Sequence, residues 1–310
     1  MIFQINGFSR LVLARLAAVS MVASLSAHSF ASNQVEARIV GGSDVSISDS
    51  PWQVALMTEW DLQFCGGSIV GDRWILTAAH CYTRQSSYIR AGVTNKNSNL
   101  GQDIDVLRQI PYPGYDALDL DNDVMLLELA ERLDLSGPNA KAIRIMTPEA
   151  ALSGLQDPGV MAVITGWGSI AEGGSGVAVL QRGVVPIVSD QEASAAYEPL
   201  FGPGIVTSSM TAAGYSEGGI DVCQGDSGGP LAVPDPTTEL GFRLAGITSW
   251  GLGCARPNFP GIYTRVSVFH DWIVEYLDLP DPSPKPEEPS FCHACLPSAS
   301  GWRSILDEYY

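Results

Sequence analysis

Short apolar runs that end at turn residues dominate this chain and restrict its fold more than any other feature. Between about residues 39 and 250, runs rich in β-branched, aliphatic and aromatic residues alternate with Gly, Pro, Asn and Asp. One hairpin is predicted from residues 63–70 to residues 73–76, across Gly71-Asp72. Further strands are predicted at residues 160–164, 180–188 and 242–250.

Only one segment has clear helical periodicity. Many strands with one terminal helix predict an all-β barrel domain on which that helix docks. The helix is predicted between residues 267 and 279, where apolar side chains recur at helical spacing: Val268, Phe269, Trp272, Ile273 and Tyr276.

The first 31 residues are predicted to be a secretory signal peptide. Arg10 and Arg15 give it a positive start, and residues 16–27 are apolar but too short to span a bilayer. Small residues in Ser29-Phe30-Ala31 suit cleavage after Ala31; a membrane anchor is the less favoured alternative. We expect a mature protein without a membrane segment, secreted to an extracellular or periplasmic compartment that permits disulfides.

The C-terminal part of the chain is not expected to fold. Residues 280–289 have proline at five of ten positions, which predicts an extended linker, and residues 290–310 are too few for a core. The tail contains Cys292-His293-Ala294-Cys295, for which a disulfide is favoured over a zinc site that would lack a fourth ligand. One folded domain is therefore expected, at residues 39–279.

Acidic residues outnumber basic ones, 34 against 17, and give a formal net charge of −17. This balance argues against a nucleic-acid partner. It could draw cationic substrates closer, although solubility is the simpler interpretation.

The segment Gly225-Asp226-Ser227-Gly228-Gly229 carries the strongest chemical signal. A serine becomes an effective nucleophile when a base takes its proton and donors stabilise the oxyanion. The flanking glycines permit a sharp turn and leave backbone N–H groups free to face a developing negative charge. Ser227 is therefore the candidate nucleophile of a hydrolase.

His80 is the candidate base, because it follows the apolar run at residues 74–76 and is fixed by its neighbour Cys81, which could pair with Cys65. His270 lies on the predicted terminal helix, where capping or packing is the expected role.

A carboxylate should orient this base and offset its positive charge. Asp123 opens an apolar strand and can lie partly in the interior. Asp116, Asp119 and Asp121 compete with it, and the local sequence does not choose among the four.

Five segments occur in an order and spacing typical of one enzyme family: Ile39-Val40-Gly41-Gly42, Thr77-Ala78-Ala79-His80-Cys81, Asp121-Asn122-Asp123-Val124, Gly225-Asp226-Ser227-Gly228-Gly229-Pro230 and Ser249-Trp250-Gly251. They resemble the chymotrypsin–trypsin family of serine endopeptidases, and the resemblance covers residues 39–279, or 241 of the 310 residues. It implies two six-stranded antiparallel β-barrels with the active site between them and a C-terminal helix.

The resemblance implies a role for each matching residue. Ser227 attacks the scissile carbonyl, His80 transfers the proton and Asp123 orients His80. The backbone N–H groups of Gly225 and Ser227 form the oxyanion hole. The serine segment also fits the Gly-x-Ser-x-Gly elbow of α/β-hydrolases, but the order His, Asp, Ser in this chain excludes that fold.

The resemblance also implies a substrate pocket. Asp221 lies six residues before the nucleophile and forms the pocket floor, with Gly251 and Gly261 as open walls. Ser249 contacts the catalytic aspartate, and Trp250-Gly251 pairs with the substrate backbone. A buried carboxylate favours a cationic partner, so the expected substrates are proteins or peptides with Arg or Lys before the cleaved bond.

Arg38 precedes Ile39, so residues 32–38 are interpreted as a short propeptide. In the resembling family, cleavage frees the ammonium of Ile39, which pairs with Asp226 and orders the pocket. The activating enzyme is expected to be a trypsin-like protease or the protein itself.

Of fifteen pairings that six cysteines allow, the resemblance implies Cys65–Cys81 and Cys223–Cys254. For two further family disulfides, both cysteines are missing. The signal peptide and the small number of disulfides together favour a bacterial exported protein. The corresponding positions hold Ala193 with Ala212 and Ala162 with about Val233.

No metal or other cofactor is expected, and the protein is expected to be a monomer. Val93 stands where some trypsins place a calcium-binding Glu, and Pro260 stands where sodium-activated relatives carry an aromatic residue. Two other functions stay open. A catalytically inactive, protease-like binding protein is one, and a serine esterase of the same fold is the other.

Overall fold

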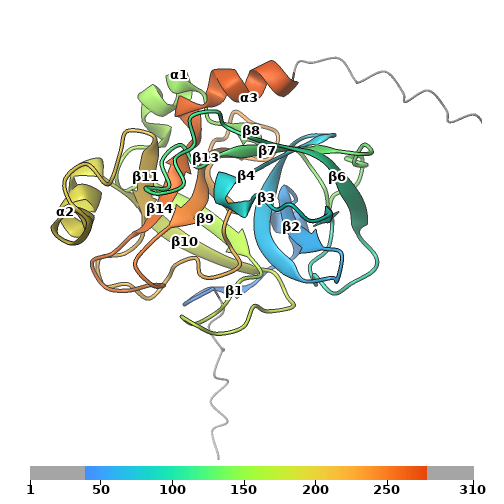
Figure 1. Ribbon diagram of the computed structural model, residues 1–310, viewed down its shortest axis with the longest axis horizontal. Coiled ribbons are helices and arrows are strands. Elements are labelled where there is room, and N and C mark those ends of the chain that lie inside the picture. The colour runs from blue at the N-terminus through green and yellow to red at the C-terminus, as the bar shows by residue number, and fades with distance from the viewer. Residues whose placement is uncertain (1–38, 278–310) are drawn as a thin grey trace, which may run out of the picture. The chain divides into compact units, whose positions relative to one another are not determined.

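A computed structural model describes residues 39–277, which form two β-barrels with three short helices (Figure 1). The expected signal peptide (1–31), propeptide (32–38), linker (280–289) and tail (290–310) lie outside the described residues, as do Arg38, Cys292 and Cys295.

The first barrel consists of six antiparallel strands in the order β2-β3-β4-β7-β6-β5, and β5 pairs with β2 to close it. Every residue of β4 and β7 is buried, because their apolar side chains fill the barrel and its contact with the rest of the domain. The strands are β2 (Gln53–Thr58), β3 (Gln63–Gly71), β4 (Trp74–Thr77), β5 (Ser87–Ala91), β6 (Gln102–Pro111) and β7 (Met125–Leu129).

The second barrel runs β9-β10-β11-β14-β13-β12, and β12 pairs with β9 to close it. Two short strands extend it: β1 (Ser43–Asp44) pairs with β10, and β8 (Arg144–Ile145) pairs in parallel with β13. Buried and more exposed residues alternate along β10, as expected for a strand with one face on a core. The barrel strands are β9 (Met161–Gly166), β10 (Gln181–Val188), β11 (Met210–Ala213), β12 (Pro230–Pro234), β13 (Phe242–Trp250) and β14 (Gly261–Arg265).

The predicted fold of two six-stranded barrels with a C-terminal helix is confirmed. Helix α3 (His270–Leu277) begins three residues later than the pattern suggests, because Val266–Val268 form a 3-10 turn first. It packs on the first barrel, although β14 of the second barrel precedes it in the chain. The contacts are between aromatic rings, with centroids 5.8 Å apart for Trp74 and Tyr276 and 5.3 Å apart for Tyr112 and Trp272.

Helices α1 (Pro148–Ala150) and α2 (Asp190–Phe201) were not expected from the sequence. Helix α2 begins with a capping box in which Ser189 and Glu192 bond each other's backbone, a signal that the sequence does contain. The helix was not predicted because its apolar stripe is weak and because Pro199 lies inside it. None of the helices in residues 39–277 is long and apolar enough to cross a membrane.

Disulfides join Cys65 to Cys81 and Cys223 to Cys254. The first ties β3 to the turn that carries His80, and the second ties the serine loop to the segment after β13. Alanine and valine side chains fill the interior at the positions of the two missing family disulfides, since all four are fully buried: Ala193, Ala212, Ala162 and Val233.

Candidate active site

His80 lies in a single 3-10 turn (Ala79–Cys81) directly after β4. Its backbone N–H donates to Oδ1 of Asp123 at 2.9 Å, and its ring Nδ1 lies 2.7 Å from Oδ2 of the same carboxylate. This double attachment fixes the ring and leaves Nε2 for proton transfer.

Asp123 is 1% exposed and precedes β7. The hydroxyl of Ser249 donates to its Oδ2, and Oγ1 of Thr264 donates to its backbone carbonyl at 2.6 Å. Both donors come from the second barrel, so Asp123 of the first barrel is held through its side chain and its backbone by the other barrel.

The three competing aspartates have other surroundings. Asp121 accepts hydrogen bonds from the hydroxyls of Thr207 and Ser209. Asp116 caps a turn by accepting from the backbone of Leu118 at 2.8 Å, and Asp119 is exposed. Only Asp123 among the four reaches His80, a choice that the local sequence left open.

The serine loop lies against the first barrel. The backbone N–H of Gly66 donates to the carbonyl of Ser227 at 2.7 Å. Gly228 has φ +78°, and a Cβ there would lie 2.1 Å from Oγ1 of Thr77, so only glycine permits this approach. Among the hydrogen bonds of residues 39–277, none joins Ser227 Oγ to His80 Nε2; such contacts often form only with substrate bound.

The backbone N–H groups of Gly225 and Ser227 donate to no group within the described part of the chain. Other contacts hold their loop, because Asp226 N–H donates to Cys223 O at 3.0 Å and Gly228 N–H donates to Thr248 O at 2.8 Å. Gly225 has φ +97°, a conformation that glycine adopts without strain. Two unengaged donors beside a serine hydroxyl are what an oxyanion hole requires.

Asp221 lies in a pocket of about 140 Å³ that Ser227 also lines. Its carboxylate accepts two backbone hydrogen bonds of 2.9 Å, from Val222 and Ala255, and burial raises its pKa to about 6. A Cβ at Gly261 would lie 2.9 Å from this carboxylate, so glycine keeps the space open. The same pocket is lined by the other residues expected to contact substrate: Ser227, Ser249, Trp250, Gly251 and Gly261.

The segment that begins at Ile39 lies against the same pocket. Ile39 is 1% exposed, and the carbonyl of Val40 accepts from the backbone N–H of Asp221 at 3.2 Å. Asp226 is also buried, and its carboxylate accepts from the N–H groups of Gly168 at 2.7 Å and Cys223 at 3.0 Å. Burial raises the pKa of Asp226 to about 7 despite these donors.

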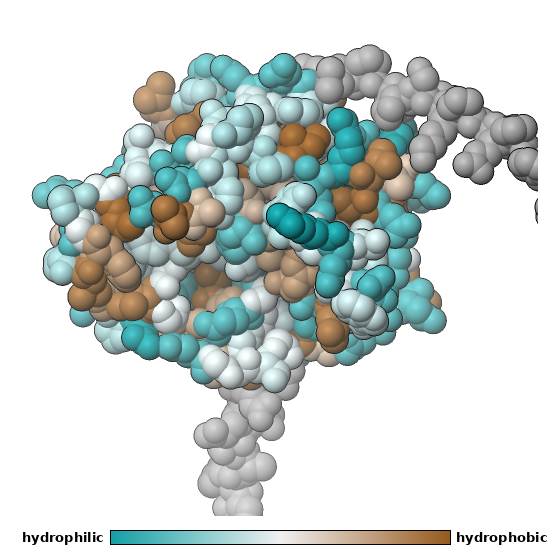
Figure 2. Space-filling model, viewed as in Figure 1, coloured by the Kyte–Doolittle hydropathy of each residue, from teal (hydrophilic) through white to brown (hydrophobic). Residues whose placement is uncertain are grey.

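Three aromatic residues form a cluster with Trp250, and none of them was singled out from the sequence. The ring of Tyr197 lies 4.8 Å from that of Trp250, Phe201 lies 6.3 Å from Trp250, and Phe259 lies 5.5 Å from Tyr197. Figure 2 shows apolar side chains on the side of the domain where α2 lies, and exposed Leu200 and Phe201 end that helix. The capping box of α2 is the sequence signal that could have revealed them.

The described residues contain one cluster that resembles a metal site, formed by Cys65, His80 and Cys81. Both cysteines are joined to each other in a disulfide, so neither offers the thiolate that a metal binds.

Comparison with protein families finds one match, to the family model described as Trypsin, over residues 39–273. Vitellin-degrading protease of Bombyx mori is 37% identical over 243 residues, which cover 77% of this chain and 86% of that protein. Trypsin of Squalus acanthias is 39% identical over 242 residues, which cover 77% of this chain and 96% of that protein.

A third relative is much longer than this chain. Transmembrane protease serine 9 of Rattus norvegicus is 41% identical over 241 residues, which are 76% of this chain and 21% of the rat protein. All three relatives are animal proteins, so the comparisons give no support to the bacterial source expected above.

Proposed function

The chain belongs to the trypsin family and is a serine endopeptidase, and from this premise we propose that it is secreted and cleaves peptide bonds after Arg or Lys. The observation that carries the proposal is the carboxylate of Asp221, buried in the pocket beside Ser227. Within residues 39–277, no cationic side chain forms an ion pair with it. A buried carboxylate without a cation is costly, and an Arg or Lys side chain of a substrate would supply the missing charge.

We infer an acyl-enzyme mechanism for this site. Ser227 Oγ attacks the carbonyl carbon while His80 Nε2 takes its proton, and Asp123 offsets the resulting imidazolium charge. The N–H groups of Gly225 and Ser227 stabilise the oxyanion. The C–N bond then breaks, His80 protonates the leaving amine, and a water molecule activated by His80 releases the acid product and restores the hydroxyl.

The affinity of the pocket for a small cation should fall in acid. The pKa of Asp221 is raised to about 6 in the empty pocket, and a bound cation favours the ionised form. Benzamidine should therefore bind with a constant Kd above about pH 6 and weaken by about tenfold per pH unit below it, because binding must first remove the proton. Calorimetric titration between pH 4.5 and pH 8 measures this profile.

The matched control is Asp221→Asn, in which the titrating group is gone and the side-chain size is kept. Its benzamidine affinity should be weak and nearly independent of pH. A wild-type profile that stays flat down to pH 4.5 would show that Asp221 does not contact the cation.

We further propose that the protein is made as a zymogen cleaved after Arg38. The burial of Ile39 and the pairing of Val40 with Asp221 support this, because the segment behind the cleavage site already contacts the pocket floor. Asp226 is buried, and within residues 39–277 its carboxylate accepts hydrogen bonds only from backbone donors, so it is a suitable receiver for the new ammonium. An ammonium there would favour the ionised carboxylate and stabilise the loop around Ser227.

A fluorogenic arginine amide tests the function as a whole. The proposed enzyme hydrolyses it, and a serine-reactive phosphonate abolishes the activity. An inactive binding protein would give no turnover and no labelling, whereas an esterase would hydrolyse esters and leave amides intact. We expect turnover without added metal or cofactor, by an extracellular monomer whose activator is another protease or itself.

A further inference from the structure

The side chain of Lys96 reaches from the loop between β5 and β6 toward the serine loop. Its ammonium donates to Oε1 of Gln63 at 2.7 Å and to the carbonyl of Trp167 at 3.2 Å. The side chain is half-buried, and burial lowers the pKa of Lys96 while the charge of Asp226 opposes this effect. A half-buried lysine with two defined partners is rarely an ordinary surface charge.

Gln63 connects Lys96 to the proposed oxyanion hole. Its Nε2 donates to the carbonyl of Gly225 at 2.9 Å, while its Oε1 accepts from Lys96. The amide of Gln63 can make both contacts at once in only one orientation, because its oxygen accepts and its nitrogen donates. Lys96 therefore fixes the orientation of Gln63, and Gln63 holds the Gly225–Asp226 peptide, which adjoins the Gln224–Gly225 peptide that carries the proposed oxyanion-hole N–H.

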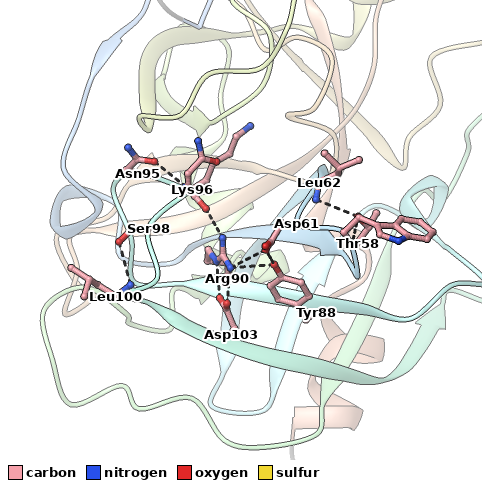
Figure 3. Close-up of polar contacts among 12 residues, drawn as sticks. Thr58, Asp61, Leu62, Tyr88, Arg90, Asn95, Lys96, Ser98, Leu100 and Asp103 are labelled. Atoms are coloured by element: carbon pink, nitrogen blue, oxygen red, sulfur yellow. Dashed lines mark hydrogen bonds and ion pairs between the residues drawn. The ribbon is translucent and has the colours of Figure 1, made fainter.

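The backbone of Lys96 is held by a separate polar cluster around Arg90. Figure 3 shows the guanidinium of Arg90 at the centre of a polar cluster, in contact with the Lys96 carbonyl at 2.8 Å. Two hydrogen bonds of 2.7 and 2.6 Å join Arg90 to Asp103, and Asp61 and Tyr88 complete the cluster. A guanidinium fixed by a bidentate carboxylate is a rigid anchor, so the base of the Lys96 side chain has a defined position.

Lys96 also supplies positive charge near Asp226. Within the described residues, it is the cation whose charge lowers the pKa of Asp226, against the strong opposite effect of burial. Until the bond after Arg38 is cut, Ile39 has no ammonium to offer. Lys96 is present both before and after that cleavage.

We propose that Lys96 is a positioning residue of the active site: through Gln63 it holds the carbonyl of the Gly225–Asp226 peptide, and this restricts the backbone of Gly225, whose N–H belongs to the neighbouring peptide and faces the oxyanion. This inference rests on the proposed oxyanion hole at Gly225. Neither residue contacts the reacting atoms, so the effect should reach catalysis through transition-state binding alone.

The substitution Lys96→Met, made in the fully cleaved enzyme, should lower kcat for an arginine amide about tenfold and leave KM within twofold. Complete loss of an oxyanion donor costs about 10²–10³ in kcat, and a loosened donor should cost less. Affinity for a peptide arginine aldehyde, which forms a tetrahedral adduct with Ser227, should fall by a similar factor. Affinity for benzamidine, which occupies only the Asp221 pocket, should stay unchanged.

Three variants make this test specific. Lys141→Met removes the other lysine of residues 39–277 and should change neither kcat nor aldehyde affinity. Lys96→Arg keeps the charge and donors and should restore part of the loss. Gln63→Leu should reproduce the loss, and the double variant Lys96→Met with Gln63→Leu should lose no more than the worse single variant, because both act through one contact.

Equal kcat and equal aldehyde affinity in Lys96→Met and Lys141→Met would overturn the proposal. If Lys96→Met does not fold, as judged by thermal unfolding and benzamidine binding, Gln63→Leu decides in the same assays. Failure of the proposed function is a separate result: wild-type enzyme would then neither hydrolyse the arginine amide nor react with the phosphonate. The role of Lys96 is therefore tested only by the ratios of kcat and of aldehyde affinity between the variants and an active wild-type enzyme.

Discussion

Asp221→Ser should abolish cleavage after Arg and Lys, with kcat/KM for an arginine amide about 10⁴-fold lower than wild type. A site built to pair with a polar substrate group discriminates by about 10⁴–10⁵ when that pairing is lost. In the variant, a substrate guanidinium would enter a pocket of about 140 Å³ and lose its water without gaining a carboxylate. Steady-state kinetics with matched amides that differ only at the P1 residue measure the effect.

Two controls separate lost specificity from lost chemistry. Labelling of the Asp221→Ser variant by an uncharged serine-reactive phosphonate should continue, because Ser227 and His80 are not touched. Glu217→Ser removes an exposed acidic charge from the neighbouring loop and should keep wild-type activity. An Asp221→Ser variant that retains full activity on the arginine amide would show that the primary pocket lies elsewhere.

Arg38→Gln should yield a secreted precursor that hydrolyses the arginine amide at least about 10²–10³-fold more slowly than the cleaved enzyme. Loss of one oxyanion donor alone has this effect, and in the precursor the whole loop around Asp226 lacks the Ile39 ammonium. With its pKa raised to about 7 by burial, Asp226 is only partly ionised near neutral pH until a second cation arrives. Mass spectrometry should show an intact bond between residues 38 and 39 in the inactive material.

The matched control is Arg84→Gln, the same substitution at an exposed arginine. It should be cleaved and active like wild type. A precursor in which residues 32–38 are replaced by the recognition site of an unrelated protease should regain activity when that protease exposes Ile39. Full activity of Arg38→Gln with the bond intact would contradict the zymogen proposal.

Strands and the terminal helix were predictable because their patterns are local. The segment that became β13 is a run rich in apolar residues that ends at Gly251, and α3 carries a strong apolar stripe. Helix α2 was not predicted because its apolar stripe is weak. It is stabilised instead by tertiary packing, such as that of Tyr197 against Trp250, which leaves little periodicity in the sequence.

The residues of the candidate site likewise divide into those that a sequence motif identifies and those that only long-range contacts identify. Motif order gave His80, Asp123 and Ser227 together, whereas the local sequence around Asp123 could not rank it above its neighbours. That ranking depends on contacts such as the Ser249 hydrogen bond, made across 126 residues of sequence. The contacts of Gln63 with Lys96 and Gly225 span 33 and 162 residues and left no local pattern to recognise.

The most direct test of the proposed function is the cleavage profile of the enzyme, cut before Ile39, on a peptide library with every residue represented at P1. We expect cleavage almost entirely after Arg and Lys, because only these side chains bring a positive charge to Asp221. A profile dominated by apolar P1 residues, or ester hydrolysis without any peptide cleavage, would contradict it.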